Sequence, residues 1–282
     1  MYNRGRPIPD EQLEREKNLF IEKAIGHDQT DIHLEYCNEF RNWINSTKLN
    51  TIKGLNLFPV SEFSMGTTES FDKFYVRHKS RKLKVLKGEY SYHSYATSIE
   101  FIEDSPLTDQ DCVIISIPFA DSGTEWKYHE TMQKCSELKI PVLVDCCWFG
   151  TCAGINLDLT YPCIEDVVFA LSKTFPVNKL RIGCRFSKGN RDGLSIYSEH
   201  GYLNFFTMNI GLQFLKKYEA DFMWTQYNNM QMLFCETHKV SPSAVVCLAL
   251  GNEEKWNYLN RGGPFNRLCI SDELAKYKYC TE

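Results

Sequence analysis

Three short runs of the sequence are apolar at almost every position rather than at every second one. They read CVIISIPF at 112–119, IPVLVDCC at 140–147 and DVVFALS at 166–172. Strands that are apolar on both faces are typical of a parallel sheet whose two sides are both covered by helices. These runs therefore predict an α/β fold with a mostly parallel sheet covered by helices on both faces.

Other segments extend this pattern along the chain. Helical spacing predicts helices over 9–26, 31–46, about 202–218 and 220–239, and a charged amphipathic helix between 119 and 140. Strand-like runs lie at 82–88, 98–103 and 180–186, with 243–250 and 266–271 in a smaller terminal layer. We therefore expect an N-terminal helical segment over 1–50, a large domain over 51–200 and a reduced α+β small domain over 201–282.

Composition narrows the class of protein. The chain has 282 residues and is 43% hydrophobic, so it is long enough to bury a full core. Its formal net charge of −4 argues against nucleic acid as a partner. The basic stretch RHKSRKLK at 77–84 is interpreted as a solvated helix end. No apolar run approaches the roughly 20 residues that cross a bilayer, and the polar start lacks a signal peptide's apolar centre. These features predict a cytoplasmic protein with no membrane partner.

The cysteines and histidines give no metal-binding pattern. The twelve cysteines form no CxxC pair and the seven histidines no HxxH or HExxH spacing, so we expect buried reduced thiols and no metal site. Cys147 and Cys152, close to other candidate residues, are the two thiols to examine for reactivity.

Polar and charged residues follow several of the predicted strands. Asp145 ends one strand, Lys173 ends the next, Arg181 lies beside a third, and SMGTTES at 64–70 opens a helix. In open α/β sheets, ligands bind beyond the carboxyl ends of the strands. A helix N-terminus also offers free amides to a phosphate. Taken singly, each feature has an ordinary structural explanation: a turn cap, a lysine reaching solvent, an arginine paired with a carboxylate, and a helix N-cap.

The order of these residues resembles that of the fold-type I pyridoxal phosphate enzymes, and among them the class I/II aminotransferases. Such enzymes carry, in sequence order, a glycine-containing phosphate loop, an aromatic residue over the pyridine ring, an aspartate, a Schiff-base lysine and an arginine in an RxG setting. Matching positions here are Gly66 with Thr67 and Thr68, Tyr92, Asp145, Lys173 and Arg181. The chain is short for this family, and the resemblance runs from about residue 60 to 190.

The resemblance implies a role for each of these residues. Pyridoxal phosphate is the implied cofactor: its phosphate would contact Gly66, Thr67, Thr68 and Arg181, and Tyr92 would stack on its ring. Asp145 would pair with the pyridine nitrogen, and Lys173 would bind the cofactor covalently and then move protons at the substrate Cα. Arg267, in FNRLCIS, would receive a substrate carboxylate. An exposed Arg267 would instead pair with Asp272 or Glu273 and favour an amine substrate.

Several positions depart from the family pattern. FADSG at 119–123 stands where the family has an NPTG turn, Trp148 replaces a tyrosine, and Ala170 replaces a hydroxyl residue. The resemblance therefore leaves three hypotheses: an aminotransferase, another pyridoxal phosphate reaction such as decarboxylation, elimination or condensation, and a non-catalytic binding module. It also implies a homodimer acting on an amino acid or amine, with Tyr36 as a candidate contact to the partner's phosphate. The turn NRGGP at 260–264 is a candidate loop over the substrate.

Overall fold

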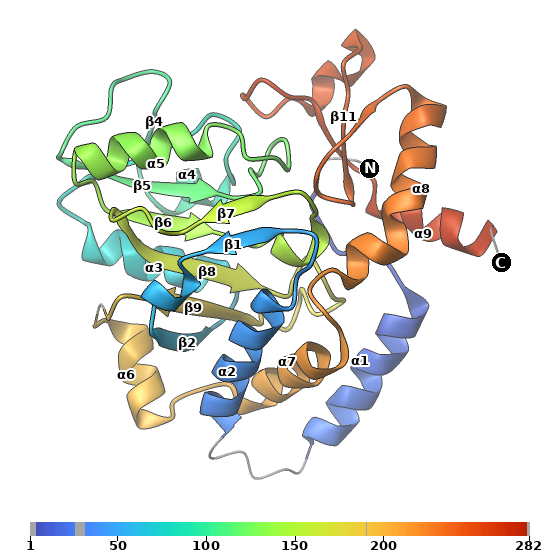
Figure 1. The fold of residues 1–282 in the computed structure, drawn as a ribbon, viewed down its shortest axis with the longest axis horizontal. Helices are drawn as coiled ribbons and strands as arrows, with labels where there is room; N and C mark the ends of the chain where they lie inside the picture. The colour runs from blue at the N-terminus through green and yellow to red at the C-terminus, as the bar shows by residue number, and fades with distance from the viewer. Residues whose placement is uncertain (1–3, 26–31, 190, 281–282) are drawn as a thin grey trace.

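The structure is a computed structural model that describes residues 4–25, 32–189 and 191–280 (Figure 1). The predicted end of the first helix at residue 26 and the predicted start of the second at residue 31 lie outside these ranges. In the described part of the chain, no helix combines the length and apolar character that crossing a bilayer requires.

A seven-stranded sheet forms the centre of the large domain. Its strands lie in the order β2-β9-β8-β6-β5-β3-β4, and only β9 runs against the others. The bounds are β2 Val60–Ser64, β3 Lys82–Val85, β4 Ile99–Phe101, β5 Asp111–Ser116, β6 Val142–Asp145, β8 Ile164–Ala170 and β9 Gly183–Ser187. The mostly parallel sheet confirms the predicted fold class.

Both faces of this sheet are apolar, as the continuous runs predict. In β5, Cys112 and Ile114 pack with the apolar residues of α3, whereas Val113 and Ile115 belong to the core on the opposite face. Because successive side chains of a strand point to opposite faces, burial on both sides requires apolar residues at consecutive positions. Helix α2 contacts β2 and helix α5 contacts β5 on one side, and α3 contacts β8 and β9 on the other.

Each predicted helix is present, whereas the helices over 92–96, 193–200 and 271–280 were not predicted. Their bounds are α1 Glu11–Ala24, α2 Ile32–Asn45, α3 Thr67–Arg77, α4 Tyr92–Ala96, α5 Tyr128–Glu137, α6 Gly193–His200, α7 Phe205–Lys217, α8 Phe222–His238 and α9 Ser271–Cys280. Short 3-10 turns occur at η1 Leu55–Leu57, η2 Phe149–Thr151 and η3 Glu254–Leu259, and β1 Thr51–Lys53 pairs with β7 Asn156–Asp158. Sequence patterns indicated neither this small sheet nor β2 and α6.

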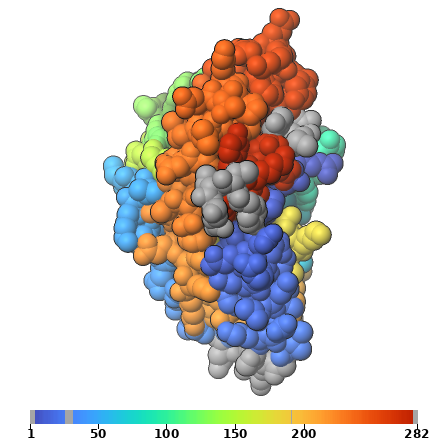
Figure 2. Space-filling view, turned by 90° about the vertical axis from the view of Figure 1, so that its right-hand side faces the viewer, coloured from blue at the N-terminus to red at the C-terminus, as the bar shows by residue number. Residues whose placement is uncertain are grey.

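The C-terminal residues form a second, smaller layer. Strands β10 (Ser241–Pro242), β11 (Leu248–Leu250) and β12 (Arg267–Cys269) make an antiparallel sheet, and α8 contacts both this sheet and α9. Figure 2 shows this layer, in orange and red, above the blue N-terminal helix. Helix α7, although it falls within the predicted small domain, packs against α1 and α2.

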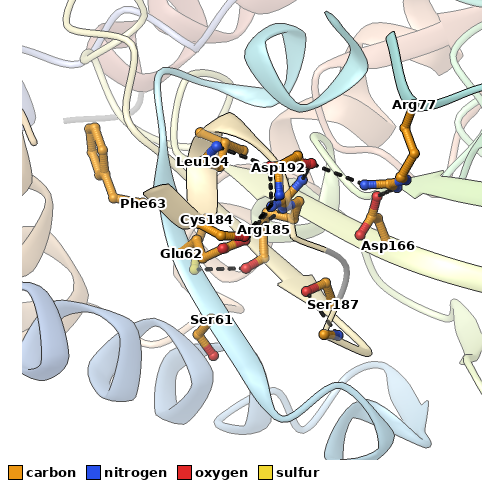
Figure 3. Close-up of polar contacts among 12 residues, drawn as sticks. Ser61, Glu62, Phe63, Arg77, Asp166, Cys184, Arg185, Ser187, Asp192 and Leu194 are labelled. Carbon is orange, nitrogen blue, oxygen red and sulfur yellow. Dashed lines mark hydrogen bonds and ion pairs between the residues drawn. The ribbon is translucent and has the colours of Figure 1, made fainter. Parts of the chain in front are cut away.

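A buried ionic network holds the antiparallel edge of the large sheet (Figure 3). Arg185, on β9, is fully buried, and its Nε donates to the Oε2 of Glu62 on β2 at 2.8 Å. Its Nη1 donates to Asp192 at 2.5 Å. Arg77, at the end of α3, contacts the same Asp192 at 3.0 Å and also Asp166 on β8. Five charges thus join two helices to three strands.

Candidate functional site

The candidate residues meet at one edge of the large sheet. Asp145 ends β6, Lys173 follows β8 by three residues, and Gly66 follows β2 by two. Strand β9 runs in the opposite direction, so Arg181, which precedes it, also lies at the carboxyl edge of the parallel strands. The topology therefore brings together residues that are spread over more than a hundred positions of the sequence.

A cavity of about 370 Å³ opens at this edge, a size typical of small-molecule sites. Most of the predicted cofactor and substrate residues line it. The lining residues are Arg4, Gly5, Thr67, Thr68, Tyr90, Ser91, Ser116, Ala120, Asp145, Cys147, Trp148, Ser172, Lys173, Arg181, Arg261 and Arg267. Of the predicted residues outside this lining, Gly66 abuts Arg181 and Tyr92 lies further away. No group of three or more potential metal ligands occurs among the described residues.

The start of α3 forms a cradle for an anion. Gly66 has a φ of 73°, and no side chain caps the helix that begins at Thr67, so its first amides face the cavity without a capping partner. Arg181 Nη2 donates to Thr68 Oγ1 at 3.1 Å, and a Cβ on Gly66 would lie 2.5 Å from that Nη2. Arg181 itself has a φ of 56°, a conformation that costs a non-glycine residue roughly 1–2 kcal/mol. A phosphate fits this combination of amides, hydroxyls and a guanidinium.

Asp145 presents a buried carboxyl to the cavity. Its Oδ1 accepts a hydrogen bond from the Cys147 amide at 3.0 Å. Burial, followed by the charge of Glu89, raises the pKa of Asp145 to about 7. Glu89 is itself 7% exposed and accepts from the amide and hydroxyl of Ser116 at 2.9 and 2.5 Å. A cationic ring nitrogen fits here, because it would be a counter-charge for the buried carboxylate of Asp145.

Lys173 is half-buried, not fully buried as its place after an apolar run predicts. Its Nζ donates to the main-chain carbonyl of Gly5 at 2.5 Å and lies 5.1 Å from the centre of the Trp148 ring. A Cβ on Gly5 would lie 2.6 Å from that ring. The N-terminal segment therefore contacts the lysine directly, and both line the cavity.

The tyrosine at the cavity is not the predicted one. Tyr92 donates its hydroxyl hydrogen to Asp72 at 2.9 Å, which holds its side chain on α4 outside the cavity lining. Tyr90 lines the cavity, and the two tyrosine rings stack with centroids 6.1 Å apart and planes at 16°. The two tyrosines are only two positions apart in YSYHSY at 90–95, but helix α4 begins at Tyr92 and that side chain turns away from the cavity.

Arg267 lies on β12 with 5% of its surface exposed. Its Nη1 donates to the Ala120 carbonyl at 2.6 Å. The alternative of a surface ion pair is wrong, because Asp272 pairs with Arg6 and Glu273 with Lys276. The buried Arg267 side chain lines the cavity instead.

The turn that departs from the family pattern lies beside Arg267. Ala120 lines the cavity, whereas Asp121 is fully buried behind it. Burial raises the pKa of Asp121 to about 6, and the charges of Arg261 and Arg267 oppose that rise. A Cβ on Gly263 would lie 2.5 Å from the Asp121 Oδ2. Asp121 thus packs against the NRGGP turn and leaves the cavity face to Ala120.

Two further sequence expectations are corrected. Tyr36 is completely buried and donates its hydroxyl hydrogen to the Gly183 carbonyl at 2.9 Å, so it belongs to the core and cannot reach a partner subunit. Burial raises the pKa of Cys147 and of Cys152 well above the usual range. Both are free, and neither thiol is activated, because a thiolate is disfavoured in an apolar setting.

Sequence reasoning missed several residues of the cavity. Ser116, which lines the cavity, ends β5, and its partner Glu89, which lies outside the lining, follows β3. The rule about carboxyl ends of strands applies to both and would have found them. Arg261 lies in the NRGGP turn, which the sequence indicated only as a loop. Arg4 and Gly5 carried no signal, because their position depends on how the N-terminus crosses the finished domain.

The sheet order, the lone antiparallel strand and the cavity at the carboxyl edge define the chain as having the fold of the fold-type I pyridoxal phosphate-dependent enzymes. The chain aligns over 98% of its length with a probable N-succinyldiaminopimelate aminotransferase from Thermus thermophilus, covering 91% of that chain, with a TM-score of 0.67 and 14% identity.

Two other solved structures are similar to the same degree. A PLP-bound C-S lyase from Staphylococcus hominis aligns over 98% of this chain and 88% of its own, with a TM-score of 0.69 and 13% identity. An aromatic aminotransferase from Pyrococcus horikoshii aligns over 97% and 92%, with a TM-score of 0.68 and 14% identity. No family model and no curated protein matches the sequence. At these identities the likeness concerns the fold.

Proposed function

We propose that this chain is a pyridoxal phosphate-dependent enzyme that acts at the Cα of an amino acid, with amino-group transfer as its reaction. The observation that carries the proposal is the meeting of Lys173, Asp145 and the anion cradle of α3 in one cavity. Each has the chemistry that a different part of the cofactor needs: an amine for the aldehyde, a carboxylate for the ring nitrogen and an anion site for the phosphate.

Each residue of the cavity has a defined task in this proposal. The amides at the start of α3, Thr68 and Arg181 would hold the phosphate. Asp145 would keep the ring nitrogen protonated, and Tyr90, rather than Tyr92, would cover the ring. When bound, the cofactor supplies an electron sink for the bond broken at Cα.

The remaining steps belong to the chain's own side chains. Lys173 would carry the proton to and from Cα, since its amine lies in the cavity and its flexible stem lets it reach both sides of a transfer. Arg267 would orient the substrate through its carboxylate, because a guanidinium matches a carboxylate with two parallel hydrogen bonds. The N-terminal segment over Lys173 would exclude water from the reacting atoms.

Elimination on the same scaffold is a second candidate. One of the similar structures is a C-S lyase, and Trp148 stands at the cavity where the family pattern has a tyrosine. A tryptophan ring has no hydroxyl that could contact the cofactor's 3-oxygen, which is a departure from the aminotransferase pattern. The reaction then depends on which bond at Cα the cavity aligns with the cofactor ring. Release of ammonia and a keto acid without an amino acceptor would identify elimination. Release of carbon dioxide would identify decarboxylation.

The test of the proposal is cofactor binding to the wild type and to Lys173→Ala. Wild-type protein mixed with pyridoxal phosphate should acquire a visible absorption band that borohydride fixes on the peptide containing Lys173. The variant should lack the band while keeping the wild-type circular dichroism. A band that persists unchanged in the variant would refute the assignment, and a wild type without any band would leave the non-catalytic binding module as the better hypothesis.

A further inference from the structure

The cavity has more positive charge than the proposed cofactor and an amino acid's carboxylate can neutralise. Its lining contains Lys173 and four arginines, Arg4, Arg181, Arg261 and Arg267, against one acidic side chain, Asp145. Four positive charges therefore remain before anything binds. A phosphate of roughly −2 and one carboxylate leave one positive charge without a counter-charge. Arg4 is exposed to water, whereas Arg261 is only partly exposed, so Arg261 gains more from an anionic partner.

The proposed function gives no task to two of these arginines, Arg4 and Arg261, and Arg261 is the one that hydrogen bonds hold at the cavity. It lies in the turn between η3 and β12, where its Nη1 donates to the Ala120 carbonyl at 3.3 Å and its Nη2 to the Glu89 carbonyl at 3.2 Å. The turn is itself fixed, because Asn260 accepts from the Gly262 amide at 2.9 Å and donates to the Gly263 carbonyl at 3.0 Å. The guanidinium is therefore held in place at the cavity wall.

Arg261 and Arg267 share one acceptor. Both donate to the Ala120 carbonyl, at 3.3 and 2.6 Å. Burial and then the neighbouring charge of Arg261 lower the pKa of Arg267 to about 10, which shows how closely the two cations interact. Asp121 offsets part of this repulsion from behind Ala120, but it is fully buried and absent from the cavity lining. An anion on the cavity side would relieve the remainder.

We propose that the substrate carries a second anionic group on its side chain and that Arg261 binds this group while Arg267 binds the α-carboxylate. This inference rests on the proposed function and specifies its substrate class: amino acids with an acidic or phosphorylated side chain. Two guanidinium groups fixed on one carbonyl present two adjacent anion sites. Arg4, on the N-terminal segment, adds a further positive charge to the cavity lining.

The experiment compares matched substrate pairs that differ in side-chain charge. Wild type, Arg261→Gln, Arg261→Lys and the control Arg191→Gln are each loaded with pyridoxal phosphate and given glutamate or glutamine, aspartate or asparagine, and O-phosphoserine or serine. Arg191 is a suitable control because its exposed ion pair with Glu199 lies outside the cavity lining. The kcat/KM for each pair and the melting temperature of each variant are measured.

We expect wild type and Arg191→Gln to prefer the anionic member of at least one pair. Arg261→Gln should reduce that preference by roughly tenfold or more, with little change for the neutral member, and Arg261→Lys should keep part of it. A preference for O-phosphoserine over glutamate would identify the second anion as a phosphate, and the reverse as a carboxylate. Wild type without any anionic preference, or a preference that Arg261→Gln leaves intact, overturns the inference.

A binding measurement separates this inference from the proposed function. Glutarate and butyrate both lack an amino group and differ in having two carboxylates and one. In wild type, glutarate should perturb the bound cofactor's absorption at a lower concentration than butyrate, and Arg261→Gln should reduce the difference between these two concentrations. If neutral amino acids react and the diacid holds no advantage, only the substrate class is wrong. If no amino acid of either kind alters the cofactor's absorption, the proposed function itself fails.

Discussion

Asp145 shows how the fold changes the behaviour of a single side chain. Its carboxyl is almost completely buried, and burial together with Glu89 raises its pKa to about 7. An aspartate in an unfolded chain has a pKa near 3.9. Between these two values the folded protein binds the proton more tightly than the unfolded chain does, so its stability falls as the pH rises.

We therefore predict that Asp145→Asn stabilises the cofactor-free protein at neutral pH. The amide keeps the shape of the carboxyl but never ionises, so the variant should exceed wild type by on the order of 2–4 kcal/mol at pH 8 and equal it near pH 4. Urea unfolding of both proteins from pH 4 to 8 measures the difference. Glu89 is present in both proteins and its charge raises the pKa of Asp145, so the difference contains the repulsion between these two carboxyls as well as the burial of Asp145. A constant difference across this range would contradict the raised pKa.

Gly66 gives a second prediction at the residue scale. A Cβ there would lie 2.5 Å from Arg181 Nη2, so Gly66→Ala should displace the guanidinium from the anion cradle and weaken pyridoxal phosphate binding by roughly tenfold or more. Gly154 is a matched control, because its φ of 74° is almost the same as the 73° of Gly66 and nothing lies within 4 Å of its would-be Cβ. Titration of Gly66→Ala and Gly154→Ala with pyridoxal phosphate should show the loss in Gly66→Ala alone.

At the scale of elements, the antiparallel strand β9 depends on charges rather than on apolar packing alone. One face of β9 packs Phe186 against Phe40 of α2, with ring centroids 6.4 Å apart. The other face carries Arg185, whose contacts to Glu62 and Asp192 tie β9 to β2 and to the start of α6. Asp192 also caps α6, accepting from the Leu194 amide at 2.9 Å. Loss of the arginine would affect all three elements.

We predict that Arg185→Met destabilises the protein by about 3–5 kcal/mol, because it leaves buried carboxylates without their cation. The exposed Arg191, which pairs with Glu199, is the control, and Arg191→Met should cost well under about 1 kcal/mol. Denaturant unfolding measures both. Equal effects of the two substitutions would mean that the buried network contributes no more than a surface ion pair.

Across the whole molecule, the N-terminal segment links the cavity to the start of α9. Gly5 accepts a hydrogen bond from Lys173, and the next residue, Arg6, accepts one from the Ser271 hydroxyl at 2.8 Å and pairs with Asp272 at the start of α9. The site is thus enclosed by the large sheet, the C-terminal layer and the N-terminal segment. Changes at either end of the chain should therefore alter the cavity.

The predicted assembly of this chain is a homodimer. Met208 and Phe214 of α7 are buried within the chain, whereas Phe206 of the same helix is 38% exposed. The homodimer now rests on the resemblance, in which a second subunit completes the cofactor site. We expect sedimentation at micromolar concentration to give a twofold dimer, and a monomer that still binds pyridoxal phosphate tightly would rule this out.

Local patterns in the sequence were sufficient for the elements that carry the site. The continuous apolar runs predicted β5, β6 and β8, and the residues that follow strands predicted Asp145 and Lys173, because strand burial and chain direction are encoded within a few residues. The order of these residues along the chain also indicated the fold class. Short elements such as β1 and β7 were missed, since three residues are too few for a period to appear.

Only the tertiary structure decided which side chains meet. Lys84, in the stretch interpreted as a solvated helix end, is buried and lies 3.4 Å from Asp111, and Arg77 belongs to the ionic network. Tyr90 rather than Tyr92 faces the cavity because α4 starts where it does, and Arg261 and Gly5 reach it from distant segments. The sequence by itself determined the longer buried strands and the order in which the site residues follow them, because both depend on neighbours along the chain. The partners of each charge depend on neighbours in space, which long-range packing alone creates.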